Sequence, residues 1–194
     1  MIRVMIVDDH PALRAGLRVV LDAEPGIVFA GESAGDEESV WPAMNRSRPD
    51  LVLLDYHLPR GDGLQLCFRI KHEVPAPHVI VFSAYASPTL ALPARLAGAD
   101  GLLAKDLGAR ELFHSIRAVH GGDRLVPPVS ATVLEEAFGR LDPAHHALIG
   151  MVLDGASESE VAETLGTERR EVRHAVHRIL HALRLDIPTA GTRG

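Results

Sequence analysis

Hydrophobic and polar positions follow two alternating patterns along the first 120 residues. Short apolar runs, typical of buried strands, occupy residues 2–7, 27–30, 51–54, 79–82 and 101–103. Stretches with helical periodicity lie between and after them, at residues 11–22, 36–47, 63–72, 88–97 and 109–120. This alternation, with strands apolar on both faces, predicts an α/β fold with a doubly wound, five-stranded parallel sheet that helices cover on both sides.

The pattern changes to helices alone in the last third of the chain. After Pro127-Pro128 and a short helical stretch at 133–138, helices are expected at residues 143–153, 158–165 and 168–184. Ser157-x-x-Glu160 forms a capping box, and Gly166 ends the helix that it opens. Two short helices joined by a tight glycine turn are typical of a helix-turn-helix.

These patterns divide the chain into two folded parts of unequal size. We expect an α/β domain at 1–120, a linker with a short helix at 121–140, a small all-α helix-turn-helix domain at 141–187 and a flexible tail at 188–194.

Composition narrows the class of protein. The chain is 46% hydrophobic and 24% charged, as in ordinary globular proteins, and no apolar run approaches the roughly 18 residues of a membrane-spanning helix. Asp8-Asp9 interrupts any signal-peptide core, and the single Cys67 excludes a disulfide framework. We therefore expect a cytoplasmic protein that does not interact with membranes.

Chemically distinctive side chains stand at the predicted carboxyl ends of four strands, where open parallel sheets form their sites. Asp8 and Asp9 follow the first strand, Asp55 the third, Ser83 the fourth and Lys105 the fifth. Taken singly, each has a plain structural role as a helix cap, turn residue or surface charge. Together they predict one pocket, in which three carboxylates favour a hard divalent cation such as Mg²⁺.

The choice of lysine at position 105 is informative. The chain has eighteen arginines but only two lysines, Lys71 and Lys105. This bias suggests that position 105 requires a compact ammonium group on a flexible stem.

The order and spacing of these residues are similar to those of a known family. Asp8-Asp9-His10, Asp55-x-x-x-Pro59-x-x-x-Gly63, Ser83 and Lys105 resemble the motifs of response-regulator receiver domains. The resemblance covers about residues 1–120 and implies the flavodoxin-like receiver fold of two-component systems.

The resemblance implies a phosphoryl-transfer role for the pocket. Asp55 would be the phosphoacceptor of a sensor histidine kinase, with Lys105 and Mg²⁺ neutralising the transferred group. The metal would be held by Asp8, Asp9, Asp55 and the backbone carbonyl of His57. Such a receiver catalyses only its own phosphorylation and dephosphorylation, so a metabolic enzyme is not expected.

The residues that couple phosphorylation to a conformational change depart from the family pattern. The resemblance implies that Ser83 moves toward the phosphoryl group. The family usually has Tyr or Phe three residues before the lysine, where this chain has Leu102. We therefore expect a modified switch, in which Tyr85 is a candidate substitute for the missing ring.

The C-terminal helices are similar to the LuxR-type helix-turn-helix of the NarL/FixJ family. The similarity rests on framework positions that include Leu141, Pro143, Gly155, Ser157, Glu160, Val161, Ala162, Leu165, Gly166, Val172, Ile179, Leu180 and Leu183. It implies a transcription regulator whose last helix enters the DNA major groove. The expected DNA contacts are Arg169, Arg170, Arg173, His174 and His177, in a homodimer that forms on phosphorylation and binds an inverted repeat.

The charge of the C-terminal segment is also compatible with a second interpretation of its function. From Gly139 to the end there are seven basic and eight acidic residues, which is unusual for a DNA-binding module. Ser159 and Glu171 replace the Lys and Thr that are common in the family. In the alternative, the protein is a phosphorylation-controlled signalling protein whose degenerate helix-turn-helix binds protein partners.

Overall fold

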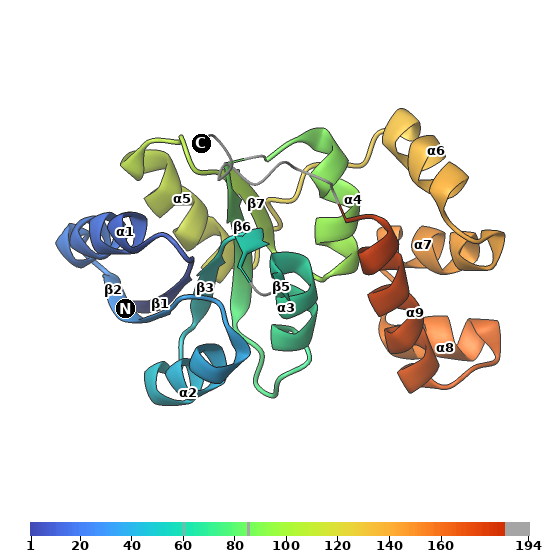
Figure 1. The fold of residues 1–194 in the computed structure, drawn as a ribbon, viewed down its shortest axis with the longest axis horizontal. Helices are drawn as coiled ribbons and strands as arrows, with labels where there is room; N and C mark the ends of the chain where they lie inside the picture. The colour runs from blue at the N-terminus through green and yellow to red at the C-terminus, as the bar shows by residue number, and fades with distance from the viewer. Residues whose placement is uncertain (60, 85, 185–194) are drawn as a thin grey trace, which may run out of the picture.

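A computed structural model describes residues 1–59, 61–84 and 86–184, which form an N-terminal α/β lobe and a C-terminal helical lobe (Figure 1). The strands are β1 (Ile2–Val7), β2 (Ile27–Ser33), β3 (Leu51–Leu54), β4 (His57–Leu58), β5 (Gly61–Asp62), β6 (His78–Ser83) and β7 (Gly101–Ala104). The helices of the N-terminal lobe are α1 (Pro11–Ala23), α2 (Glu37–Ser47), α3 (Gly63–Ile70), α4 (Pro88–Leu96) and α5 (Ala109–His120). The C-terminal lobe contains α6 (Ala131–Arg140), a 3₁₀ turn (Pro143–His145), α7 (His146–Leu153), α8 (Glu158–Leu165) and α9 (Arg169–Ala182).

The five long strands form the parallel sheet that the sequence predicts. Their order is β2-β1-β3-β6-β7, and every neighbouring pair is parallel. The chain changes its direction of winding between β1 and β3, and in such sheets this is where the carboxyl ends open a crevice. The predicted fold class is therefore confirmed.

Alternate residues of each strand supply two separate cores. One core lies under α1 and α5 and includes Val4, Ile6, Leu51, Leu53, Ile80 and Phe82. The other lies under α2, α3 and α4 and includes Met5, Val7, Val52, Leu54, Val79 and Val81. This second core continues without a break into the C-terminal lobe, where Ile149, Val161 and Ile179 belong to the same cluster.

Two local features differ from the sequence prediction. The short antiparallel pair β4–β5 was not expected, because two-residue strands are too short to show a hydrophobic period. The helix predicted at 143–153 begins as a 3₁₀ turn after Asp142, whose side chain accepts a hydrogen bond from the Ala144 N–H at 2.9 Å.

Local capping explains the helix-turn-helix. The Ser157 hydroxyl accepts a bond from the Glu160 N–H at 3.3 Å, and the Glu160 carboxylate accepts one from the Ser157 N–H at 2.7 Å. Gly166 ends α8 with φ = +64°, a left-handed conformation that glycine adopts without strain. The sequence predicted both features.

The two lobes meet along α3 and α4 of the N-terminal lobe. Helix α9 lies against α3, while α6 and α7 lie against α4 (Figure 1). Leu90, Ala91, Leu92 and Ala94 of α4 are almost completely inaccessible to solvent. Helix α4 is therefore buried between the sheet on one side and the C-terminal lobe on the other.

The structure also bears on membrane association. Within the described ranges, no helix combines the length and the apolar character that crossing a bilayer requires.

Gly63, the last residue of the Asp55-x-x-x-Pro59-x-x-x-Gly63 motif, is required by a close backbone approach. A Cβ atom at this position would lie 2.1 Å from the Asp55 carbonyl oxygen and 2.8 Å from the Tyr56 Cα. Both neighbours are backbone atoms, so they cannot move aside as a flexible side chain would. The glycine thus keeps α3 close to the turn that presents Asp55.

We predict that Gly63→Ala lowers the free energy of unfolding by about 2 kcal/mol, because the added methyl group overlaps backbone. The control is Gly61→Ala, since a Cβ at Gly61 meets nothing within 4 Å and should change stability by less than about 0.5 kcal/mol. Chemical denaturation of both variants measures the difference. Equal stabilities would contradict the close approach.

Candidate functional site

The carboxyl end of the sheet brings together the residues that the sequence placed at its strand ends. Asp8, Asp55 and Ser83 are all nearly inaccessible to solvent. The Asp55 N–H donates to the Val7 carbonyl at 2.8 Å, which continues the β1–β3 ladder by one residue. The two aspartates are therefore held on adjacent strands, in a pocket that favours ions only when they are paired.

Lys105 supplies the opposite charge. Its ammonium lies 2.6 Å from Asp8 Oδ2 and 2.8 Å from Asp55 Oδ2, so one cation bridges both carboxylates. The Lys105 N–H donates to the Ser83 carbonyl at 3.0 Å, which holds the lysine next to the end of β6. Lys105, the position at which the sequence analysis expected a required ammonium group, thus lies at the centre of the pocket.

Competing effects act on the ionisation of Asp55. Burial, the largest effect, raises the pKa of its carboxyl, whereas the hydrogen bond and charge of Lys105 lower it. The neighbouring Asp8 raises the pKa again, and the hydrogen bond from the His57 N–H at 3.2 Å lowers it. The net shift is upward, and Lys105 is the main group that favours the charged carboxylate.

The acidic side of the pocket has the donor set of a divalent-cation site. Asp8, Asp9, His10 and Asp55 each place a possible ligand atom within 4.8 Å of the others. Carboxylate oxygens suit Mg²⁺, and a cation would relieve repulsion that Lys105 alone only partly compensates.

His10 is a member of this cluster that the sequence reasoning missed. Its Nδ1 lies 2.7 Å from Asp9 Oδ1 and 3.1 Å from Asp8 Oδ1. Its position directly after Asp8-Asp9 was the available signal. One ring nitrogen thus lies close to both carboxylates at the mouth of the pocket, and the imidazole itself is largely exposed.

The predicted switch residues lie in different surroundings. Ser83 is fully buried at the end of β6. Leu102 is buried on β7, in the core shared by α4 and the C-terminal lobe, and its N–H donates to the Leu125 carbonyl at 3.3 Å. Tyr85 lies outside the described residues.

The helix expected to contact DNA is packed against the N-terminal lobe. Gln65 of α3 donates from Nε2 to the backbone carbonyl of His177 on α9 at 3.1 Å. Arg184 lies 4.0 Å from Asp62 at the start of the same helix α3. His174 and His177 are nevertheless exposed side chains. In this arrangement α3 lies directly beside α9.

Acidic side chains pair with the three arginines that the sequence assigned to DNA. Glu158 Oε1 lies 3.3 Å from Arg173 Nε and 3.7 Å from Arg169 Nε. Arg170 Nε lies 3.0 Å from Glu168 Oε2. The two pairs of Glu158 were not predicted, because they depend on how α8 packs against α9, whereas the pair of Arg170 with Glu168 is local to the start of α9.

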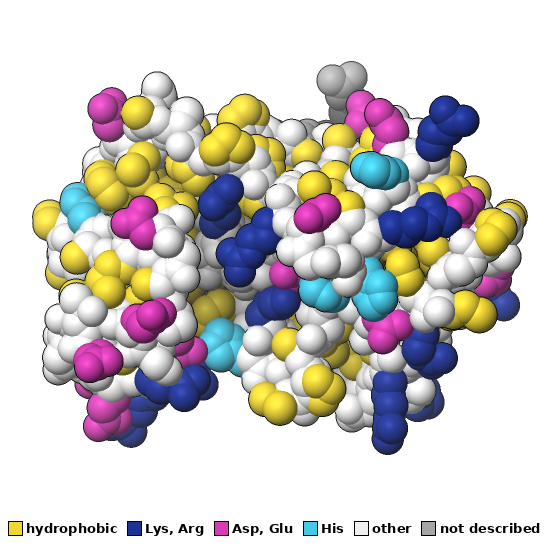
Figure 2. All heavy atoms as spheres, turned by 180° about the vertical axis from the view of Figure 1, so that it is seen from behind, with side chains coloured by type: hydrophobic (Ala, Val, Ile, Leu, Met, Phe, Trp, Pro, Cys, Tyr) yellow, Lys and Arg dark blue, Asp and Glu magenta, His cyan; other side chains and the backbone are white. Residues whose placement is uncertain are grey.

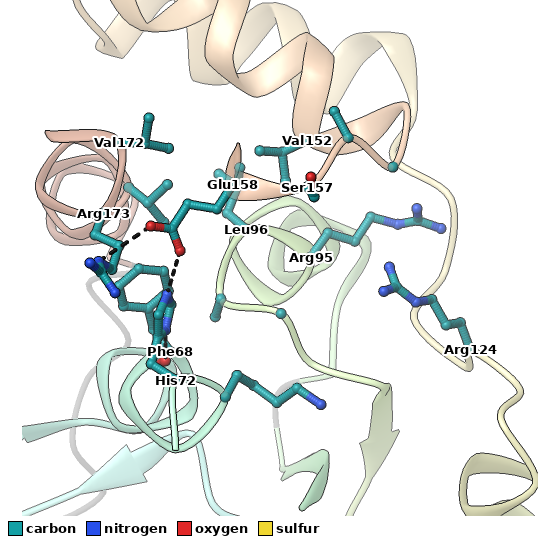
Figure 3. A pocket seen from close by; sticks show the side chains of 16 residues that line it. Phe68, His72, Arg95, Leu96, Arg124, Val152, Ser157, Glu158, Val172 and Arg173 are labelled. Carbon is teal, nitrogen blue, oxygen red and sulfur yellow. Dashed lines mark hydrogen bonds and ion pairs between the residues drawn. The ribbon is translucent and has the colours of Figure 1, made fainter. Parts of the chain in front are cut away.

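Glu158 also joins the two lobes. Its Oε2 lies 3.1 Å from His72 Nε2, just after α3, so one carboxylate contacts both the N-terminal lobe and the arginines of α9 (Figure 3). The Glu158 side chain is only 20% exposed, which strengthens these contacts relative to surface pairs.

Glu171 has a local structural role. Its carboxylate accepts hydrogen bonds from the Thr167 hydroxyl and from the Glu168 N–H, which caps the start of α9. The bond from Thr167 is the main cause that lowers the pKa of Glu171. The acid that replaces the family's Thr therefore stabilises its own helix.

Comparison with known proteins identifies the family. Residues 4–117 match the response regulator receiver domain family. The DNA-binding transcriptional activator DevR/DosR of Mycobacterium tuberculosis is 29% identical over 96% of this chain and 90% of its own length. A solved two-component response regulator of the LuxR family from Aurantimonas sp. SI85-9A1 is 30% identical, covering 70% of this chain and 97% of that one, with a TM-score of 0.59.

A further solved structure spans both lobes. The response regulator ChrA of a heme-sensing two-component system is 29% identical, covering 97% of this chain and 93% of that one, with a TM-score of 0.53. With the acidic pocket, the bridging lysine and the helix-turn-helix in place, this chain belongs to the response regulators of the NarL/FixJ type.

Proposed function

We propose that this response regulator accepts a phosphoryl group on Asp55 from a sensor histidine kinase and regulates transcription by binding DNA through α9. The observation that carries the first half is the bridge from Lys105 to both Asp8 and Asp55 inside a buried pocket at the carboxyl end of the sheet. A buried nucleophile beside a fixed cation is the arrangement that phosphoryl transfer needs.

The proposed transfer follows from the position of Asp55. A carboxylate oxygen of Asp55 attacks the phosphorus of a phosphohistidine; the new O–P bond forms as the P–N bond breaks, and the kinase imidazole leaves with its electron pair. Lys105 then turns from the Asp55 carboxylate to the transferred phosphoryl oxygens, which carry the greater negative charge. The receiver thus catalyses only its own phosphorylation and dephosphorylation.

We further propose that Asp8, Asp9, Asp55 and the backbone carbonyl of His57 hold Mg²⁺. The clustered carboxylates support this assignment. When bound, Mg²⁺ supplies charge neutralisation for the incoming phosphoryl oxygens. Asp9 and Asp8 position it, and the His10 ring lies close to both carboxylates.

The switch is proposed to run through Ser83 and Leu102. The Ser83 hydroxyl moves to hydrogen-bond the phosphoryl group, and the adjoining strand β7 transmits the movement through Leu102. Leu102 supports this path because it packs in the core that α4 shares with the C-terminal lobe. Any role of Tyr85 stays a prediction.

For the domain division we propose a receiver at 1–120, a linker at 121–140, a helix-turn-helix domain at 141–187 and a tail at 188–194. Part of the proposed linker is packed against folded structure: Phe138 of α6 stacks on His146 of α7, with 4.1 Å between the ring centroids. Helix α6 therefore contacts the C-terminal domain as well as α4 of the N-terminal lobe.

DNA binding is proposed to use Arg169, Arg170, Arg173, His174 and His177 in the major groove. Similarity to a protein named a DNA-binding transcriptional activator supports this role. Phosphorylation would separate α9 from α3, break the contact between Glu158 and His72 and allow a homodimer to bind an inverted repeat.

A second candidate function is supported by the charge distribution. Arg169, Arg170 and Arg173 are already paired with Glu158 and Glu168, as expected of a helix face that contacts protein instead of DNA. In that case the released C-terminal lobe would bind a protein partner.

Phosphoacceptor identity is tested by substitution. We predict that Asp55→Asn abolishes phosphorylation by acetyl phosphate with Mg²⁺, because an amide oxygen is a poor nucleophile. The control Asp106→Asn removes an exposed carboxylate one residue after Lys105 and should be labelled like the unmodified protein. Intact-mass analysis measures both. Undiminished labelling of Asp55→Asn would overturn the assignment.

Glu158 provides the test of DNA binding. We predict that Glu158→Gln raises affinity for duplex DNA about fivefold at low salt, because it frees Arg169 and Arg173 and breaks the contact with His72. Glu163→Gln is the matched control: it removes the same charge from an exposed position on the same helix. Fluorescence anisotropy measures both affinities.

The Glu158 experiment distinguishes a specific role of this residue from a general effect of net charge. An equal, small increase for both variants would show that only net charge matters and contradict the specific role of Glu158. No detectable DNA binding by any of the proteins, even with beryllofluoride and Mg²⁺, would favour the protein-binding candidate.

A further inference from the structure

A cavity of about 360 Å³ lies between the two lobes and shares no residue with the acidic pocket. One wall comes from α3, α4 and the segment after α5, and the other from the α7–α8 turn and α9 (Figure 3). Its apolar lining includes Phe68 and Leu96 from the N-terminal lobe and Val152, Val172 and Val176 from the C-terminal lobe. This volume is within the range of small-molecule sites.

The charges of the cavity are mostly of one sign. Lys71, Arg95, Arg124 and Arg173 line it, whereas Glu158 is its only carboxylate. Figure 2 shows Lys and Arg side chains gathered in the hollow where the lobes meet. Because Lys71 pairs with Asp100 and Arg173 with Glu158, the excess of positive charge beside the apolar surface comes from Arg95 and Arg124.

Three of the four cations have partners within the protein. The Lys71 ammonium lies 2.8 Å from Asp100 Oδ2, and Arg173 pairs with Glu158. Arg95 donates from Nε and from one terminal nitrogen to the Pro127 and Val126 carbonyls, each at 3.1 Å. These bonds hold the Arg95 guanidinium in place and leave its other terminal nitrogen available.

Arg124 is different. Among the residues that the structure describes, it makes no hydrogen bond or ion pair, and its side chain extends toward Arg95 (Figure 3). No carboxylate that lines the cavity lies on that side, since Glu158 is engaged with His72 and Arg173. Arg124 is exposed, so solvent screens its repulsion of Arg95, and an anion bound between the two guanidinium groups would pair with both.

We propose that this cavity binds a small amphipathic anion: an aromatic or aliphatic body with one carboxylate, sulfonate or phosphate group. The anionic group would lie between Arg124 and Arg95, where guanidinium groups offer paired donors. The apolar body would lie against Phe68, Leu96 and Val152. This chemistry excludes neutral ligands and inorganic phosphate alone as the best occupants.

Such a ligand controls the arrangement of the lobes. Its anionic group is held by the N-terminal lobe while its body also touches the C-terminal lobe, so it binds only when the lobes are together. By linkage it stabilises the packed arrangement. The cavity is thus a chemical input separate from Asp55, and it does not depend on DNA binding.

The test uses 8-anilinonaphthalene-1-sulfonate, an aromatic sulfonate whose fluorescence rises on binding, and its neutral analogue N-phenyl-1-naphthylamine. We predict that Arg124→Gln weakens binding of the sulfonate about fivefold and that Arg124→Glu weakens it about tenfold or more. Both variants should bind the neutral analogue as the unmodified protein does. Arg110→Gln, at an exposed arginine outside the cavity, is the control.

A variant on the opposite wall tests contact with both lobes. Val152→Ser should weaken binding of the sulfonate and the neutral analogue alike, because it changes only the apolar surface. Unchanged sulfonate binding in both Arg124 variants would overturn the proposal. So would an equal loss of both probes in those variants, which would assign binding to the apolar surface alone.

Discussion

The bridge from Lys105 to Asp8 and Asp55 is the interaction on which the functional pocket depends. Two carboxylates buried at the ends of adjacent strands repel each other, and one ammonium at 2.6 and 2.8 Å partly compensates both. This arrangement requires strands β1, β3 and β7 to end at one edge, which only the parallel order of the sheet provides. In the proposed function, a phosphoryl group on Asp55 would break this bridge, so the same interaction would connect the chemistry with structural change.

The position of the C-terminal lobe depends on its interface with the N-terminal lobe. Helix α4 is buried from both sides, and Leu102 of β7 belongs to the same core as the C-terminal helices. In the proposed switch, a movement near Lys105 would reach the lobe interface through these packed side chains. At that interface Glu158 pairs with His72 across the lobes and with Arg173 within the C-terminal lobe, so separation of the lobes would break the contact with His72 and leave the pair with Arg173 in place.

Much of this organisation could be predicted from the sequence, and the exceptions have physical reasons. Strand ends are visible in the hydrophobic pattern, so the convergence of Asp8, Asp55 and Lys105 followed from topology alone. The β4–β5 pair was not predicted, because strands of two residues are too short to show a hydrophobic period. The role of Glu158 was missed because its partner His72 is 86 residues away, and no local pattern encodes the packing of α8 on α3.

Selection of DNA from a random pool, with and without beryllofluoride and Mg²⁺ at two salt concentrations, tests the central claim most directly. Our account predicts enrichment of an inverted repeat that is stronger with the phosphoryl mimic and weaker at high salt, since phosphate contacts release counterions. Enrichment of the same strength with and without the mimic would contradict control by Asp55. No enrichment in either state, with the mimic bound, would contradict DNA as the partner of α9.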